Sequence, residues 1–388
     1  MNGPVSTQAA KALAGAANVA IVRIEAIPLK VKLERDAVGS NLKFTHRHAV
    51  VTRIHTDAGV VGECFNGNDD ALQPAIVRMI VEEMAPKLVG RRVVAVEEAW
   101  AMTRVATEPF LRDRRVALRA QACIDSALHD AVGKLAGLPL HTLWGSARTE
   151  VPAIVLGGYY RDRNELEELA DEVRELKASG AAGIKLKVGG RTPEQDAERA
   201  RAVRRAGGDD FILACDANQG WTRADAIAFA QRVSDLDLRW YEEPCKWDND
   251  REDMAAVRKA TGLKISAGQS ELSSFGCRDL MKAGAIDICN FDASWGGGPT
   301  EWWRMAALAE SMGIGVCQHI EPQIGAMMVA AAPTGTFAEM LLPWRDPFFL
   351  KLIADQKPMR NGRYPLPTRP GWGMVFDEDY FAFARRKD

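Results

Sequence analysis

Lys185 and Lys187 stand two residues apart in the run IKLKVGG, whose other residues favour a buried strand. Because side chains alternate along a strand, both ammonium groups should point to the same face and repel each other. Crowding and partial loss of solvent would lower the pKa of Lys187, and a lysine of lowered pKa can act as a general base. The pair therefore predicts a site that removes a proton from a bound substrate.

Oxygen-bearing side chains follow three other apolar runs. Asp216 stands in CDANQGW, Glu242 in WYEEP and Gln269 in SAGQSE. Ligands of this kind suit a hard divalent cation such as Mg²⁺. If the substrate is a carboxylate, the cation and Lys185 would bind its oxygens and stabilise the enediolate formed when the α-proton leaves.

A second proton-transfer group is predicted at His319, in VCQHIEPQ, with Asp292 of CNFDASWGGG beside it. A carboxylate can orient an imidazole and stabilise its charged form. Glu339 of TFAEML, if protonated, would donate a hydrogen bond to the developing oxyanion. A single histidine on an apolar strand more often packs in the core, so the prediction depends on the pairing with Asp292.

The elements that must position these residues follow a repeating pattern of apolar run, polar residue and amphipathic segment, which is typical of βα units. Eight such runs occur, at 151–156, 183–188, 211–215, 238–241, 263–267, 286–291, 314–317 and, weakly, 336–342. Eight parallel strands predict a (β/α)8 barrel, in which residues at the carboxyl ends of all strands meet at one mouth. The candidate residues stand at these ends and are therefore expected to form one site.

The chain on either side of the barrel is expected to form a separate domain and two terminal segments. Residues 20–148 predict an α+β domain, with alternating strands at 21–33 and 48–56 and a turn at 57–59. We expect a flexible tail at 1–19, the barrel at 149–345, and a Pro- and Gly-rich segment at 346–388 that packs back on the first domain.

Composition limits the partners. The 388 residues are 47% hydrophobic and 26% charged, with a formal net charge of -2, which gives no field for nucleic acid or an anionic membrane. No apolar run is long enough for a membrane span, and the seven cysteines form no CxxC pair. A small-molecule partner and a cytoplasmic location fit these features.

Through the motifs that contain these residues, the sequence resembles the mandelate racemase subgroup of the enolase superfamily over roughly residues 20–375. The matching motifs, in order, are KLK at 185–187, DANQGW at 216–221, EEP at 242–244, FDASWGGG at 291–298, and His319 followed by Glu339. The resemblance implies that Lys187 and His319 are the acid/base pair, that Asp292 supports the histidine, and that Asn218 contacts the substrate. It also implies a homo-oligomer, and a capping first domain whose loops at 35–48 and 66–70 select the substrate.

One position departs from the family pattern. The third metal ligand of the family is normally a glutamate, whereas this sequence has Gln269, followed two residues later by Glu271. The glutamine carbonyl is the expected third ligand and Glu271 the alternative. His46, in the polar segment RDAVGSNLKFTHRH, is a further candidate substrate contact, as are Tyr159 and Trp295, for which core packing is the alternative.

Three functions are compatible with these residues. The first is Mg²⁺-dependent dehydration of an acid sugar, an aldonate or aldarate, to a 2-keto-3-deoxy acid. The second is a racemase or epimerase that uses the same lysine and histidine on a related carboxylate. The third is a ligand-binding barrel without catalytic activity, which the altered third ligand position would favour.

Overall fold

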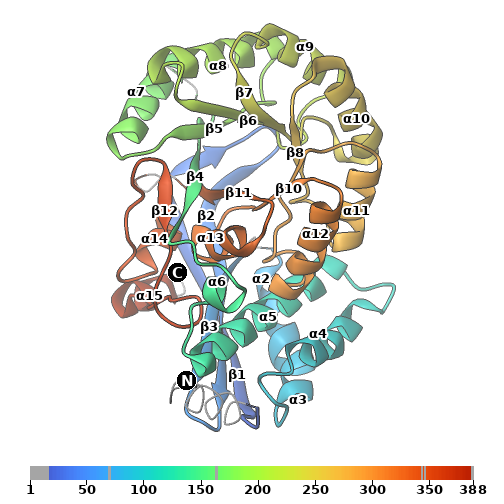
Figure 1. The fold of residues 1–388 in the computed structure, drawn as a ribbon, viewed down its shortest axis with the longest axis vertical. Coiled ribbons are helices and arrows are strands. Elements are labelled where there is room, and N and C mark those ends of the chain that lie inside the picture. The colour runs from blue at the N-terminus through green and yellow to red at the C-terminus, as the bar shows by residue number, and fades with distance from the viewer. Residues whose placement is uncertain (1–16, 69–70, 162–164, 342–343, 345–346, 386–388) are drawn as a thin grey trace, which may run out of the picture.

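The computed structural model describes residues 17–68, 71–161, 165–341, 344 and 347–385. Of the expected tail, residues 1–16 lie outside this range, as do residues 69 and 70 of the second expected loop. Figure 1 shows a barrel ringed by helices and a smaller domain in which several helices pack on an antiparallel sheet. None of the helices in the described ranges is both long and apolar enough to cross a membrane.

The smaller domain, here called the capping domain, has an antiparallel sheet in the order β1-β2-β3. Its strands are β1 (Ile21–Val38), β2 (Lys43–Thr56) and β3 (Val61–Asn68). Its helical segments are α2 (Gln73–Arg78), η1 (Met79–Met84), α3 (Ala85–Leu88), α4 (Val96–Arg104), η2 (Val105–Thr107), α5 (Arg114–Ala136) and α6 (Leu140–Leu143). The helices bury one face of the sheet around Val50, Ile54 and Leu128.

Helix α5 is the main support of this sheet. Asp113 caps its start by accepting a hydrogen bond from the backbone N–H of Arg115, and Gly137, with φ of 69°, ends it. Gly62 of β3 lies so close that a Cβ there would be 2.4 Å from the carbonyl oxygen of Ala127. Only glycine allows the helix and strand to approach this closely, and the approach fixes the cap's inner wall.

The barrel has eight parallel strands, and pairing of the last with the first closes it. The strands are β4 (Glu150–Gly157), β5 (Gly183–Lys187), β6 (Ile212–Asp216), β7 (Leu238–Glu242), β8 (Ile265–Ala267), β9 (Ile288–Cys289), β10 (Gly315–Gln318) and β11 (Gly335–Met340). The outer ring contains α7 (Glu165–Ala178), α8 (Pro193–Gly207), α9 (Arg223–Arg232), η3 (Trp247–Asn249), α10 (Asp250–Thr261), α11 (Ser274–Lys282), α12 (Pro299–Ser311) and α13 (Pro322–Ala331). The predicted (β/α)8 barrel with an α+β capping domain is confirmed.

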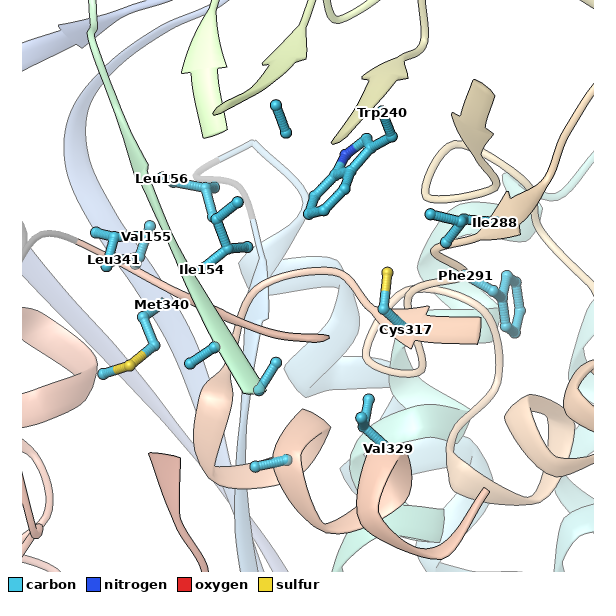
Figure 2. Close-up of a cluster of buried hydrophobic side chains, with 14 of the residues drawn as sticks. Ile154, Val155, Leu156, Trp240, Ile288, Phe291, Cys317, Val329, Met340 and Leu341 are labelled. Carbon is cyan, nitrogen blue, oxygen red and sulfur yellow. The ribbon is translucent and has the colours of Figure 1, made fainter. Parts of the chain in front are cut away.

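Apolar side chains fill the barrel below its mouth. Figure 2 shows Ile154 and Val155 on opposite sides of β4, with Ile154 on the side of Trp240 and Cys317. The ring of Trp240 lies 5.4 Å from that of Phe337. Because a packed interior fixes the strands, the polar groups at their carboxyl ends are held in register.

The C-terminal segment contacts both parts of the molecule. It contains α14 (Phe348–Lys351), β12 (Arg363–Pro365) and α15 (Glu378–Arg385). Strand β12 pairs antiparallel with β4 of the barrel. In the capping domain, the indole N–H of Trp372 donates to the carbonyl of Ser126 at 2.9 Å. The segment therefore ties the cap to the barrel.

Residues 35–48, expected as a loop, are largely strand. Strands β1 and β2 continue through them as a hairpin with its turn at residues 39–42. At the tip, Ser40 Oγ donates to the carbonyl of Ala217 at 2.7 Å, and Asn41 Nδ2 donates to the carbonyl of Asn218 at 2.7 Å. The expectation of a loop was wrong because polar residues on a two-stranded extension can face solvent without ending the strands.

Candidate active site

Lys185, at the centre of the barrel mouth, is fully buried. Its ammonium group donates to Glu242 Oε1 and to Glu339 Oε1, both at 2.5 Å, and lies 3.7 Å from Asp216 Oδ2. Burial alone would lower the pKa of Lys185, but Glu242, Glu339 and Asp216 together raise it well above its usual value. Lys185 is therefore a fixed positive charge and not a base.

Lys187 lies on the same face, as predicted, but its expected electrostatics were wrong. Its Nζ donates to Asp216 Oδ2 at 2.6 Å and to Asn218 Oδ1 at 2.8 Å. Burial and the nearby Lys185 lower the pKa of Lys187, yet the attraction of Asp216 outweighs them and the pKa is raised. The register pairs Lys187 directly with Asp216 on β6, so an acid stands closer to the amine than the repelling lysine does.

Asp216 and Glu242 end adjacent strands and pair in the same register. Burial raises the pKa of Glu242 well above its usual value, with Lys185 opposing the shift. Around the mouth lie four buried carboxyl groups and only two ammonium groups. The carboxyl groups belong to Asp216, Glu242, Glu243 and Glu339, and the ammonium groups to Lys185 and Lys187. With all groups ionised, two negative charges remain, and a divalent cation would balance them.

Both ends of the Gln269 side-chain amide have partners, and its Oε1 accepts from Asn290 Nδ2 at 3.4 Å. Its Nε2 donates to Glu243 Oε2 at 3.0 Å, and Ser270 Oγ donates to the other oxygen of Glu243 at 2.8 Å. In the described chain, no three His, Cys, Asp or Glu side chains form a ready metal cluster. For a metal site at Asp216 and Glu242, the Gln269 oxygen is the predicted third protein ligand, and an all-oxygen set of this kind fits Mg²⁺.

Glu271, the alternative ligand, is directed elsewhere. Its Oε1 accepts from Arg251 Nη2 at 2.7 Å, at the outer rim of the barrel. Burial raises the pKa of Glu271, while Arg251 lowers it. A carboxylate already paired with a guanidinium is a poor competitor for the cation, so the geometry favours Gln269.

His319 and Asp292, the predicted second proton-transfer pair, are hydrogen-bonded to each other. Asp292 Oδ2 accepts from His319 Nδ1 at 2.8 Å, which leaves Nε2 as the ring nitrogen for proton transfer. Asp292 is itself held, because its Oδ1 accepts from the backbone N–H of Ser294 at 2.8 Å. Lys187 is on β5, and His319 follows β10. Two strands separate β5 from β10 in one direction around the barrel, and four separate them in the other. The two groups thus face each other across the mouth.

Glu339 does not have its expected role as a hydrogen-bond donor. Its Oε1 accepts from Lys185 Nζ, and its Oε2 accepts from the backbone N–H of Ile320 at 3.0 Å. Both oxygens act as acceptors, so Glu339 is an ion-paired carboxylate. It positions Lys185 and the loop that follows His319.

A cavity of about 230 Å³ lies between this machinery and the capping domain. Its wall includes seven predicted site residues, which are Tyr159, Lys187, Asn218, Gln269, Asp292, Trp295 and His319. The Tyr159 ring centroid is 5.9 Å from Lys187 Nζ, and the Trp295 ring lies 5.0 Å from that of His319, edge to face. The two aromatic residues therefore border the cavity beside Lys187 and His319.

His46, the remaining predicted substrate contact of the capping domain, does not line the cavity. It is half-buried, its Nδ1 lies 2.9 Å from Thr45 Oγ1, and it is absent from the cavity wall. The neighbouring Arg47 and His48 line the cavity instead. The sequence reasoning chose the right segment and the wrong residue, because the register of the hairpin with the barrel cannot be read from the segment alone.

Two further residues of the wall were missed. Arg119 comes from α5, where it looks like one charge among several on an amphipathic helix. Glu321 stands two residues after His319, and its carboxyl accepts from the backbone N–H of Gly67 and from Ser294 Oγ. Burial, reinforced by Asp292, raises the pKa of Glu321 to about 8.

The backbone at the mouth is unusual. Positive φ values at residues other than glycine occur at Asn218 (42°), Gln219 (61°), Glu243 (36°), Ile320 (52°) and Glu321 (49°). All five follow carboxyl ends of barrel strands. Strained backbone of this kind concentrates at functional sites, where the surrounding structure holds it in place.

Comparison with known proteins agrees with this geometry. Residues 23–145 match the family model of the mandelate racemase / muconate lactonizing enzyme N-terminal domain, and residues 168–380 match that of the enolase C-terminal domain-like family. The arabinonate dehydratase of Saccharolobus solfataricus is 30% identical over 357 residues, which are 90% of this chain and 94% of the relative.

Two other similarities bear on the chemistry. The D-Ala-D/L-Ala epimerase of Cytophaga hutchinsonii is 27% identical over 380 residues, with 93% of this chain and 97% of the relative covered. A solved mandelate racemase/muconate lactonizing enzyme from a marine actinobacterium, in complex with magnesium, is 43% identical with a TM-score of 0.89. The match covers 95% of this chain and all of that one.

Proposed function

Because the chain belongs to the mandelate racemase/muconate lactonizing enzyme family of the enolase superfamily, whose members use Mg²⁺, we propose that it dehydrates an acid sugar to a 2-keto-3-deoxy acid. One observation carries the proposal. Lys187 and His319 line one cavity from strands that face each other, and each is held by a carboxylate, Asp216 or Asp292. Two oriented proton-transfer groups are what removal of an α-proton and departure of a β-hydroxyl require.

Lys187, in its neutral form, removes the proton from the carbon next to the substrate carboxylate. The electrons of the broken C–H bond move into the carboxylate and give an enediolate. The buried ammonium of Lys185 faces this charge, held in place by Glu242 and Glu339. Asp216, Glu242 and the Gln269 oxygen would hold Mg²⁺, which when bound would stabilise negative charge on the substrate carboxylate.

His319 completes the reaction. The enediolate electrons return to form the C=C bond and expel the β-hydroxyl, which leaves as water with the proton that His319 Nε2 donates. Asp292 stabilises the imidazolium before this transfer. The resulting enol gains a proton at the β-carbon and becomes a 2-keto-3-deoxy acid, so atoms and charge balance.

The test is a screen of aldonates and aldarates with Mg²⁺, with the 2-keto product detected as its semicarbazone and identified by NMR. A 2-keto-3-deoxy product from one or more acids, lost in K187M, supports the proposal. If no acid in a library of all common C4 to C6 stereoisomers yields a 2-keto product, dehydration is excluded.

Epimerisation is the second candidate, because the same two groups could remove a proton on one face and return it on the other. The similarity to an epimerase favours this alternative. In D₂O, an epimerase would place deuterium at the α-carbon of recovered acid without loss of water. A dehydratase would yield the 2-keto acid instead.

A further inference from the structure

Gln318 is the last residue of β10 and directly precedes His319. Its side chain is fully buried, and the residues that line the cavity beside Lys187 and His319 do not include it. A buried amide needs partners for its two N–H donors and its oxygen, because an unpaired polar group in the interior costs free energy. The positions of these partners therefore show which groups the side chain holds.

The amide of Gln318 contacts both members of the His319–Asp292 pair. Its Nε2 donates to Asp292 Oδ1 at 3.1 Å and to the backbone carbonyl of His319 at 2.9 Å. Its Oε1 accepts from the backbone N–H of Ala293 at 2.9 Å. Both donors and the oxygen of the amide are thus used. Because Asp292 and Ala293 follow β9, this one side chain fixes the loop after β9 relative to the end of β10.

The hydrogen bonds to Asp292 set the orientation of its carboxylate. Its Oδ1 accepts from Gln318 Nε2 and from the backbone N–H of Ser294, and its Oδ2 accepts from His319 Nδ1 at 2.8 Å. Two donors on Oδ1 hold the plane of the carboxylate and so direct Oδ2 to the imidazole. The bond at Nδ1 selects the tautomer of the ring, which leaves Nε2 for proton transfer.

Gln318 also holds the backbone next to His319. Ile320 and Glu321 have φ values of 52° and 49°, and such conformations persist only where the surrounding structure holds them. The carbonyl of His319, directly before these two residues, is fixed by Gln318 Nε2. Gly325 of α13 leaves room for the glutamine, since a Cβ at position 325 would lie 2.8 Å from Gln318 Cβ. A larger residue on this helix would therefore displace the side chain.

We propose that Gln318 is a positioning residue that keeps His319 and Asp292 in the geometry for proton transfer. This inference rests on the proposed function, in which His319 delivers a proton to the departing β-hydroxyl. Without the amide, the Asp292 carboxylate loses one of its donors and can rotate, so the imidazole loses its fixed orientation and its single tautomer. Lys187 is held by Asp216 on the other side of the mouth, so removal of the α-proton should continue.

The substitution Q318M keeps the approximate size of the side chain and removes its three hydrogen bonds. With Mg²⁺, the full-length protein and an acid that the wild type dehydrates, kcat for dehydration should fall about 10- to 100-fold, because small displacements near the reacting atoms have effects of this size. KM and the exchange of the α-proton with D₂O, followed by NMR, should change far less.

Q323M is the matched control. Gln323 is also buried, and its Nε2 donates to the carbonyl of Phe349 and to Gln356 Oε1. Its replacement should lower the melting temperature, as Q318M does, without changing the ratio of dehydration to exchange. If Q318M fails to fold, Q318E replaces it, because it keeps the shape of the side chain and an acceptor for the Ala293 N–H but lacks the two amide donors.

A second measurement needs no substrate. The chain contains six histidines, so ¹⁵N labelling of histidine gives few ring signals, and H319N identifies those of His319. In the wild type, we expect one tautomer of His319, with the proton on Nδ1. In Q318M, the ring signals should shift toward those of a histidine that exchanges between tautomers. In Q323M, they should stay as in the wild type.

The outcomes distinguish the role of Gln318 from the proposed function. Unchanged His319 signals in Q318M, unchanged dehydration, or equal losses of dehydration and exchange would overturn the positioning role and leave dehydration intact. Absence of any 2-keto product from the wild type would overturn dehydration. In that case, the comparison of His319 signals in the wild type, Q318M and Q323M still decides whether Gln318 holds the His319–Asp292 pair.

Discussion

The two walls of the cavity hold their charges in different ways. On the barrel side, each cation has a carboxylate within hydrogen-bonding distance, as Lys187 has Asp216 and His319 has Asp292. On the capping side, Arg47 and Arg119 lie against the rings of Phe44 and Trp295. Ion pairs at neighbouring strand ends fix the position and protonation state of a group, whereas an aromatic face fixes the plane of a guanidinium.

This difference separates chemistry from selection. The barrel can keep one set of proton-transfer groups while changes on β2 or α5 alter which acid is accepted. The hydrogen bonds from the hairpin tip to Ala217 and Asn218 tie the capping-domain wall to the loop after Asp216. Variants on the barrel side should therefore affect kcat, and the following predictions test that assignment from the largest effect to the smallest.

Lys187→Met should have the largest effect. It removes the base and leaves Asp216 without its closest cation, so kcat should fall about 10⁴-fold. Exchange of the α-proton with D₂O, followed by NMR, should disappear as well. H319N is the matched variant; it should lose dehydration yet retain α-proton exchange. Retained exchange in K187M would show that another group is the base.

Asp292→Asn should have the next largest effect. An amide can still hydrogen-bond the ring of His319 but cannot stabilise the imidazolium, so kcat should fall about 10²-fold or more. The rate of α-proton exchange by Lys187 should change far less. Equal losses of exchange and dehydration would contradict the separate roles of the two sides of the barrel.

Gln269→Glu tests the third ligand. An added carboxylate should tighten Mg²⁺ binding roughly 10-fold, and Gln269→Ala should weaken it by a similar factor, as ligand charge and count set affinity. Calorimetric titration with Mg²⁺ measures both. Glu271→Gln is the control and should bind Mg²⁺ as the wild type does, because Glu271 is paired with Arg251. Weaker Mg²⁺ binding in E271Q would show that Glu271, and not Gln269, is the third ligand.

Glu321→Gln should have the smallest effect, on stability as a function of pH. Burial raises the pKa of Glu321 from 4.5 to about 8, so between these values the folded state keeps a proton that the unfolded state has released. The free energy of unfolding therefore falls as pH rises through this range, by at most about 1.4 kcal/mol per pH unit. Urea unfolding between pH 5 and 8 should show a shallower fall in E321Q. Parallel curves for the two proteins would mean that Glu321 is ionised throughout.

Much of the barrel site was predictable from sequence, and the reason is physical. Short apolar runs with polar ends identify parallel strands, and closure of the barrel brings those ends together regardless of their separation in sequence. Lys187, Asp216 and His319 were found in this way. The raised pKa of Lys187 was missed, because repulsion by Lys185 was considered without the acid that faces Lys187 on β6.

The capping wall was less predictable. A barrel strand has one functional end, but any residue along a hairpin or helix can reach the mouth, depending on how the two parts dock. Arg119 looks like a surface charge until α5 is placed against the barrel, and Arg47 differs from His46 by one position in register. Glu321 was missed because it lies beyond a strand end, on a backbone with φ of 49°.

The residues with positive φ around the mouth lower the stability of the protein. Each costs about 1–3 kcal/mol, so the rim is assembled at the expense of overall stability. At Gln219, whose side chain is absent from the cavity wall, glycine would adopt the same backbone without strain. The same change would remove the 2.9 Å hydrogen bond from Gln219 Nε2 to Ser270 Oγ, and Ser270 in turn holds Glu243 beside Gln269. Relief of backbone strain at this position therefore comes at the expense of a support of the candidate metal ligand Gln269.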